Sequence, residues 1–255
     1  MSQVAASTEF SEKVLVLKVG RFREADLWVR FVSPSRGVLT GFAFGGCKSR
    51  RRFCGCLDTF NEVLINAKAS RSGGYLSLEE GVLVNSPQGL RKDCGRMGVA
   101  VNCVKFFEAV EQGLDRRREA YELLAGAIRY LDGAESAPVH FPLLFRGRLL
   151  FELGYAPNLE ACSLCGRDLA SDGGYLLVEH GRMACGGCAP RAGGARLYLG
   201  REAVSLLARL RDTGPAEWSG LHLLPEVRKE MAAALDHFIG FHLGLVWDRG
   251  GFRRI

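Results

Sequence analysis

Short runs in which hydrophobic and polar residues alternate fill the first third of the chain and predict β-strands. In one run, Leu27, Val29 and Phe31 fall on a single face, as the period of two in a strand requires. Glycine, proline, serine or charged residues separate the runs, which is typical of turns. The predicted strands are Lys13–Gly20, Asp26–Ser33, Val38–Gly45, Phe60–Ala67 and Tyr75–Asn85.

Five strands within about 75 residues have the size of a small antiparallel barrel such as the OB-fold. The pattern alone leaves an SH3-like barrel and an open meander as alternatives. We expect an OB-fold domain over residues 1–85.

After Pro87 the hydrophobic spacing changes to three and four residues, which predicts amphipathic helices over Val99–Gly113, Arg116–Leu131 and Phe141–Leu153. A closing helix is predicted after Pro225, because proline suits a first helical turn. We therefore expect an α+β multidomain protein with a helical domain over residues 86–255, interrupted at about 160–190 by a glycine- and cysteine-rich insert. The apolar stripe of the closing helix consists of Val227, Met231, Leu235, Phe238, Phe241 and Leu245.

The composition is that of an ordinary globular chain, with 47% hydrophobic and 24% charged residues, and it excludes a mostly disordered one. Lys and Arg number 34 against 28 Asp and Glu, and the resulting net charge of +6 is compatible with binding a polyanion. The first residues, MSQVAASTEFSEK, lack the basic and apolar regions of a signal peptide. Uncharged stretches fall short of the roughly 18 residues that span a bilayer. We expect a cytoplasmic protein.

Two CxxC pairs, Cys162/Cys165 and Cys185/Cys188, are separated by 19 residues and predict a zinc site. A hairpin from Tyr175, turning at His180–Gly181, would bring the second pair back to the first. Four thiolates complete a tetrahedral zinc shell and leave no position for water, so the site would be structural rather than catalytic.

Other readings of the cysteines are two disulfides, four unrelated thiols, or His180 in place of one ligand. The total of nine cysteines is odd, so complete disulfide pairing is impossible, and a reducing compartment favours metal binding. The remaining cysteines, Cys47, Cys54, Cys56, Cys94 and Cys103, are expected to be free thiols. The alternative is a second metal site at Cys47, Cys54 and Cys56, for which no fourth ligand is evident nearby.

The densest cationic run in the chain, Lys48–Arg52, follows the third predicted strand and the flexible pair Gly45–Gly46. Guanidinium groups can hold phosphates, and Phe53 at the end of the run could stack on a base. The alternative is a solvated loop without a specific partner. A second run, Arg116–Arg118, begins a predicted helix and is expected to be a solvated face, with accessory phosphate contact as the alternative.

No catalytic constellation is visible in the sequence. The stretch Gly41–Ser49 resembles a Walker A loop, but its lysine comes one residue late because Cys47 intervenes. His237 and His242 are five residues apart, not the four of an HExxH zinc site, and no HxE accompanies the CxxC pairs. We expect a protein that binds rather than an enzyme.

Several stretches, taken in order, carry a family resemblance. They are Val14–Ser33, in which Glu24-Ala-Asp26 opens the second strand; Gly37 and the basic run Lys48–Arg52; Phe141–Gly166, with its Leu-Gly-Tyr-x-Pro turn and first cysteine pair; and the closing helix with WDRGGFRRI. In this order they resemble RecO, a bacterial family of recombination-repair mediators, over nearly the full chain.

The resemblance implies an OB-fold, a helical domain and an inserted zinc finger holding one structural Zn²⁺. RecO proteins bind single- and double-stranded DNA, anneal complementary strands, and work with RecR to load RecA onto strands coated by the single-stranded-DNA-binding protein SSB. Their helical domain can capture the acidic, phenylalanine-ended SSB tail. A bacterial, nucleoid-associated protein is expected. The implied DNA contacts are Lys48, Arg50, Arg51 and Arg52, with Lys18, Arg21, Arg23 and Arg36 as additional candidates.

Two other classes of function compete with this interpretation. A zinc-ribbon scaffold that contacts proteins would make the basic loop incidental and would bind DNA weakly. A metal-dependent enzyme acting on nucleic acid would need paired carboxylates or a His/Glu site, and neither is found in the sequence.

Overall fold

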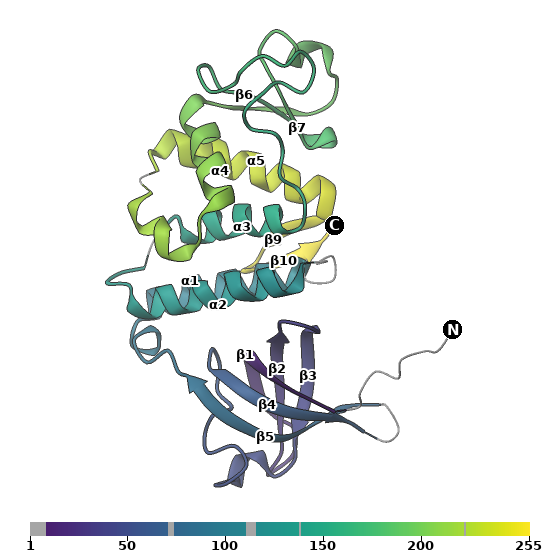
Figure 1. The fold of residues 1–255 in the computed structure, drawn as a ribbon, viewed down its shortest axis with the longest axis vertical. Coiled ribbons are helices and arrows are strands. Elements are labelled where there is room, and N and C mark those ends of the chain that lie inside the picture. The colour runs from purple at the N-terminus through teal and green to yellow at the C-terminus, as the bar shows by residue number, and fades with distance from the viewer. Residues whose placement is uncertain (1–8, 71–73, 111–115, 138, 222) are drawn as a thin grey trace. The chain divides into compact units, whose positions relative to one another are not determined.

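The computed structural model describes residues 9–70, 74–110, 116–137, 139–221 and 223–255 (Figure 1). It divides into two compact units. The first consists of Met1–Lys92 and Arg117–Asp132, and the second of Asp93–Arg116 and Gly133–Ile255.

The first unit contains a closed barrel with the strand order β1-β2-β3-β5-β4. β1 is long enough to pair with both β2 and β4, and β3 runs parallel to β5, which closes the barrel in the manner of an OB-fold. The five predicted strands are confirmed, and closure excludes the open meander. The strands are β1 Glu9–Arg21, β2 Leu27–Ser33, β3 Gly37–Ala43, β4 Glu62–Ala69 and β5 Leu76–Asn85.

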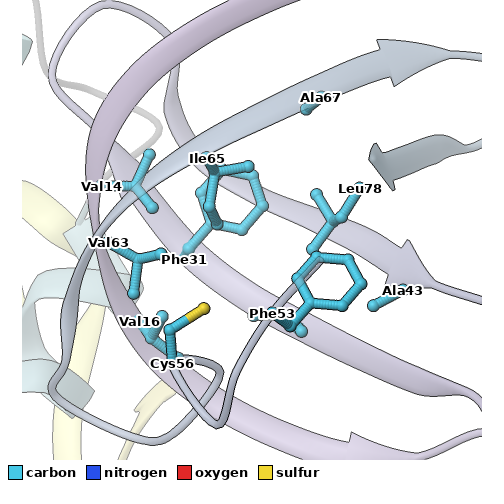
Figure 2. Close-up of a cluster of buried hydrophobic side chains, with 11 residues drawn as sticks. Val14, Val16, Phe31, Ala43, Phe53, Cys56, Val63, Ile65, Ala67 and Leu78 are labelled. Atoms are coloured by element: carbon cyan, nitrogen blue, oxygen red, sulfur yellow. The ribbon is translucent and has the colours of Figure 1, made fainter. Parts of the chain in front are cut away.

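Side chains from all five strands fill the barrel (Figure 2). Val29 and Phe31 are fully buried and Leu27 packs against them, as the predicted alternation of β2 requires. A break in register between Val16 and Lys18 changes the face that β1 presents to the core. As a result Val16 points inward and Lys18 is exposed.

Helix α2 (Arg117–Gly133) is assigned, up to Asp132, to the unit that contains the barrel. It buries one face, which includes Tyr121, Leu124 and Ile128. The carboxylate of Asp132 accepts a hydrogen bond of 2.9 Å from the N–H of Leu90, so the helix end is tied to the segment that follows β5.

The second unit contains helices α1 (Cys94–Val110), α3 (Phe141–Glu152), α4 (Arg201–Asp212) and α5 (Pro225–Leu243). A short hairpin follows α5, formed by β9 (Leu245–Asp248) and β10 (Gly251–Arg254). The predicted helices are confirmed, except that part of the predicted range Val99–Gly113 lies outside the described residues. Helix α4 and the hairpin were not predicted.

The predicted stripe of α5 is wrong at its end. Gly244 adopts a left-handed conformation with φ of 60° and ends the helix, so Leu245 belongs to β9 instead. Phe241, in the last turn, is 57% exposed. The buried face of the helix therefore ends at Phe238 and Ile239.

The insert forms a small sheet with the order β7-β6-β8, and this sheet extends beyond the predicted end of the insert at about residue 190. Its strands are β6 (Gly174–Leu177), β7 (Arg182–Ala184) and β8 (Arg196–Leu199). The predicted hairpin is confirmed, with a short 3-10 turn at Val178–His180 before Gly181. His242 Nε2 of α5 lies 2.6 Å from the Val178 carbonyl oxygen, so the turn is attached to that helix.

Hydropathy adds one constraint on the fold. Within the described residues, no helix combines the length and the apolar composition needed to cross a membrane.

Candidate metal centre and nucleic-acid interface

The four cysteines of the two CxxC pairs come together in the insert. The Sγ atoms of Cys162, Cys165, Cys185 and Cys188 all lie within 4.8 Å of one another. His180 is not part of this group. In the part of the chain that the structure describes, no second cluster of three or more such ligands is formed.

Two tight turns position these four thiols. In the first, the Gly166 N–H donates to the Cys162 carbonyl at 2.9 Å, and Gly166 has a φ of 74°, which favours glycine. In the second, the N–H groups of Cys188 and Ala189 donate to the Cys185 carbonyl at 3.0 and 2.9 Å. The Ser163 N–H donates to the Met183 carbonyl at 2.9 Å and joins the first turn to β7.

The spacing of the sulfurs fits a tetrahedral metal. The Sγ atoms of Cys165 and Cys185 are 3.7 Å apart. A zinc ion with four Zn–S bonds of about 2.3 Å requires sulfur–sulfur edges of about 3.8 Å. The residues therefore form a metal-binding cluster with the dimensions of a four-thiolate site.

Hydrogen bonds within the cluster shift the pKa values of its thiols in opposite directions. Burial raises the pKa of Cys162, but hydrogen bonds from backbone N–H groups, those of Cys185 and Leu164 first, outweigh it and lower this pKa to about 6. Hydrogen bonds with the sulfurs of Cys165 and Cys185 raise the pKa of Cys188 to about 12. A divalent cation would displace the retained protons on binding and remove the repulsion between thiolates.

The predicted basic run lies in the loop between β3 and β4. At its start, the N–H of Gly45 donates to the Asp26 carboxylate at 2.7 Å, and the N–H of Cys47 donates to the Ala25 carbonyl at 3.0 Å. At its end, the Arg52 carbonyl accepts a 2.8 Å hydrogen bond from the N–H of Gly81. The loop is therefore held to the β1–β2 turn on one side of its cations and to β5 on the other.

The expectation that Phe53 stacks on a base is wrong, because this side chain is buried in the barrel core together with Cys56 (Figure 2). Both pack over Gly81, where an added Cβ would lie 2.9 Å from the Cys56 sulfur. Burial raises the pKa of Cys56 to about 11, so this thiol stays neutral. Phe53 anchors the loop and is not available to a ligand.

The cations of the loop are not equivalent. Lys48, Arg50 and Arg51 are exposed. The Arg52 guanidinium donates to the Phe44 carbonyl and lies 5.2 Å from the Phe53 ring, so it also helps to hold the loop. The first three side chains are therefore the better placed for an external anion.

The additional candidates lie at both ends of the barrel. Arg21 ends β1 and Arg23 follows it in the β1–β2 turn, at the same end of β3 as the basic loop, since Leu27 pairs with Ala43. Lys18 is exposed on β1, 5.7 Å from the Trp28 ring.

Arg36 precedes β3 and therefore lies at the opposite end of that strand from the basic loop. Its guanidinium carbon is 4.4 Å from the Phe10 ring. Arg36 and Arg117 both line a cleft of about 660 Å³ with Phe10 and Leu39.

The second basic run is divided between the two units. Arg116 pairs with the buried carboxylate of Glu152 at 3.3 Å in the second unit. Arg117 belongs to the first unit, and Arg118 is exposed.

Two structural features near the predicted DNA contacts were missed from the sequence. Asp26 positions the start of the basic loop, and the Glu-Ala-Asp signature before β2 was its only signal. A cluster of partly exposed aromatic rings around Phe42 was missed as well, because its members come from separate turns and strands.

The protein is of the class that combines a closed OB-type barrel carrying a basic loop with a helical unit and a four-cysteine metal-binding cluster. Residues 7–87 match the family described as "Recombination protein O N terminal", and residues 91–249 match "Recombination protein O C terminal". The chain belongs to the recombination protein O, or RecO, family, and the resemblance drawn from its sequence is confirmed.

Individual relatives match almost end to end. The DNA repair protein RecO of Oleidesulfovibrio alaskensis is 47% identical over 248 residues, which cover 97% of this chain and 100% of the relative. The protein of the same name from Nitratidesulfovibrio vulgaris is 46% identical over 251 residues, with 97% and 100% coverage. That from Lawsonia intracellularis is 34% identical over 254 residues, also with 97% and 100% coverage.

Proposed function

We propose that the protein is a recombination mediator that binds single- and double-stranded DNA and anneals complementary strands. With RecR, it would help to load RecA onto DNA coated by SSB, beside the bacterial nucleoid in the cytoplasm. The observation that carries the proposal is the anchored loop that presents Lys48, Arg50 and Arg51 from a closed OB-type barrel. The DNA repair names of its relatives support it.

Annealing by this route needs no catalytic residue and no ATP, and we propose that the protein is not an enzyme. A cationic surface lowers the repulsion between two phosphate backbones and raises their local concentration. Base pairing between the strands then supplies the specificity. Binding of this kind is independent of sequence and weakens steeply with salt.

We further propose that the four cysteines hold one Zn²⁺ with a structural role. Four thiolates fill the tetrahedral shell of zinc and leave no open position for a substrate. The ion would lock the two cysteine turns together and so stabilise the small sheet, whose Val178 carbonyl is attached to α5 by His242.

The helical unit offers a small pocket for the proposed SSB tail. A cavity of about 220 Å³ is lined by Val110, Leu153, Tyr155 and Leu245, and also by Arg254. The apolar side chains suit a phenylalanine, and the exposed Arg254 would pair with its terminal carboxylate.

The proposal is tested by annealing two labelled complementary strands, both coated with SSB, without ATP and across a series of salt concentrations. We expect stoichiometric protein to accelerate annealing and rising salt to abolish the effect. A folded, metal-loaded protein that accelerates nothing would contradict the proposal. That result would favour the alternative of a zinc-ribbon scaffold, which predicts weak DNA binding and a specific protein partner.

A further inference from the structure

Aromatic rings form a partly exposed cluster on the outside of the barrel. The ring centroids of Phe22 and Phe42 are 4.9 Å apart, and those of Phe42 and Tyr75 are 6.1 Å apart. Phe44 lies 5.7 Å from Tyr75. Phe22 is 49% exposed and Tyr75 45% exposed. Together with Trp28, these residues are called the aromatic platform.

The register of the barrel places Trp28 beside this cluster. Gly20, Trp28 and Phe42 occupy directly paired positions on β1, β2 and β3, so their side-chain positions share one face. This face is the outer one, because the neighbouring Val29 points into the core. An added Cβ on Gly20 would lie 2.5 Å from the Trp28 indole, so glycine at this position lets the indole lie against β1.

Cations are interleaved with the rings. Lys18 Nζ lies 5.7 Å from the Trp28 ring, and the Arg23 guanidinium lies 5.2 Å from the Phe22 ring. The Arg52 side chain donates to the Phe44 carbonyl, so the basic loop and the platform are directly connected. Lys18 and Arg23 thus each place a positive charge beside an aromatic ring.

This combination identifies the ligand by its chemistry. The solvent-facing side of a small barrel is ordinarily polar, and exposed aromatic rings on it indicate a binding surface. An apolar protein partner would not require the surrounding cations. Single-stranded nucleic acid needs both groups, since its bases stack on aromatic rings and its phosphates pair with Lys and Arg. Charge complementarity therefore selects a single strand as the occupant.

We infer that the aromatic platform binds the unpaired bases of single-stranded DNA by stacking, while Lys18, Arg23 and the basic loop hold the phosphates. This inference rests on the proposed function and adds to it the part of the DNA that is recognised. The basic loop can bind either form of DNA through phosphate. The platform distinguishes them, because the base faces of a duplex are already covered by neighbouring bases.

Stacking also explains how a bound strand can still anneal. A base held by its face keeps its hydrogen-bonding edge free for a complementary base. Once the duplex forms, the bases stack on each other and no longer contact the aromatic platform. The platform therefore favours the separated strands and releases the paired product.

The test uses the full-length protein and the double variant Phe22→Ala/Tyr75→Ala. Affinity is measured for oligothymidylate, for an abasic strand of equal length and for a duplex. We expect the wild-type protein to bind oligothymidylate more tightly than the abasic strand. The variant should lose roughly thirty-fold in affinity for oligothymidylate, as the loss of two stacking contacts implies. Its affinities for the abasic strand and the duplex should be unchanged.

Matched variants separate stacking from damage to the barrel. Tyr75→Phe retains the ring and should bind oligothymidylate like the wild type. Val82→Ala/Val84→Ala removes two exposed apolar side chains of β5, which are 56% and 54% exposed, and should change none of the three affinities. Thermal unfolding of each variant monitors the fold.

Equal losses on all three DNAs, or equal wild-type affinity for oligothymidylate and the abasic strand, would overturn the inference while leaving the proposed function intact. A wild-type protein that binds none of the DNAs would overturn both. Photocrosslinking gives a readout that needs no variant. A strand carrying 5-iodouracil should crosslink to the wild-type protein at the platform, and crosslinks confined to the second unit would exclude stacking there.

Discussion

The Oε1 atom of Glu62, on β4, lies 2.9 Å from Nη1 of Arg129 on α2, although 67 residues separate the two in sequence. The other carboxylate oxygen lies 3.2 Å from Lys13 Nζ on β1. The Glu62 side chain is 5% exposed, whereas Arg129 is 42% exposed. One buried carboxylate thus joins two barrel strands to the helix.

Arg129→Ala should lower the free energy of unfolding by about 1–2 kcal/mol, because it leaves the buried Glu62 with Lys13 alone and the lost partner is partly exposed. Chemical denaturation measures this change. Glu122→Gln is the matched control, since Glu122 lies 3.6 Å from the other terminal nitrogen of Arg129 and is 54% exposed. Glu122→Gln should lower the free energy of unfolding by less than about 0.5 kcal/mol. Equal effects of the two variants would contradict a special role for Glu62.

Cys165→Ser should reduce bound zinc to well below one ion per chain and lower the melting temperature by about 5 °C or more. The reason is that a three-thiolate shell no longer locks the two cysteine turns together. Metal analysis and calorimetry measure both effects. Cys94→Ser, at an exposed position outside the cluster, should change neither. Unaltered stability and metal content in the Cys165 variant would argue against a structural site.

Removal of the metal with a chelator should loosen the insert and leave the barrel folded. The four ligands all belong to the second unit, and the barrel strands to the first. Limited proteolysis followed by mass spectrometry should therefore show new cleavage between residues 160 and 190. Cleavage that begins in the barrel would be the contrary result.

Replacing Arg50 and Arg51 by Ala should weaken DNA binding and make it less dependent on salt. Each lost phosphate contact reduces the slope of log affinity against log salt by about 0.7 for a single strand. Adding Arg52→Ala should also lower stability, because the Arg52 side chain donates to the Phe44 carbonyl. Arg209→Ala removes an exposed cation of α4 as a control. An unchanged slope in the loop variant would show that the loop does not contact the phosphates of DNA.

Arg254→Ala should weaken the binding of an acidic peptide that ends in phenylalanine by roughly ten-fold, because a charge-assisted hydrogen bond to the carboxylate is lost. Fluorescence anisotropy of a labelled peptide measures the affinity. Arg253→Ala is the control, since Arg253 pairs with Asp248 at 3.4 Å and does not line the pocket. Equal losses in both variants would indicate binding through net charge alone.

Local patterns in the sequence predicted the features that depend on neighbouring residues. The period of two in β2 specified which of its side chains enter the core. The two CxxC spacings predicted the sulfur cluster, because each tight turn fixes a pair of thiols. Helix α4 was not predicted, although Ala203, Val204, Leu207 and Leu210 recur at helical spacing and form a buried stripe.

Features that depend on barrel closure were beyond sequence reasoning. Phe53 follows a run of arginines, which predicts a ring available to a base, yet it is buried in the core with Cys56, where Gly81 on a distant strand leaves space for the Cys56 sulfur. The rings of Phe42 and Tyr75 meet because the parallel pairing of β3 with β5 brings Phe42 opposite Ser77, and Phe22 reaches Phe42 from the β1–β2 turn. No local pattern specifies such a contact.

The assignment of α2 to the barrel unit has a consequence for exchanging parts between relatives. A chimera that takes residues 1–92 from one protein and the remainder from another would combine β4 of one parent with α2 of the other. Its Glu62 would then face a helix that evolved against a different strand. A chimera that transplants residues 117–132 together with the strands keeps both members of the pair. The barrel unit is therefore built from two separate stretches of the chain, residues 1–92 and 117–132. Recombination between genes for such proteins should be tolerated best when it exchanges both stretches together.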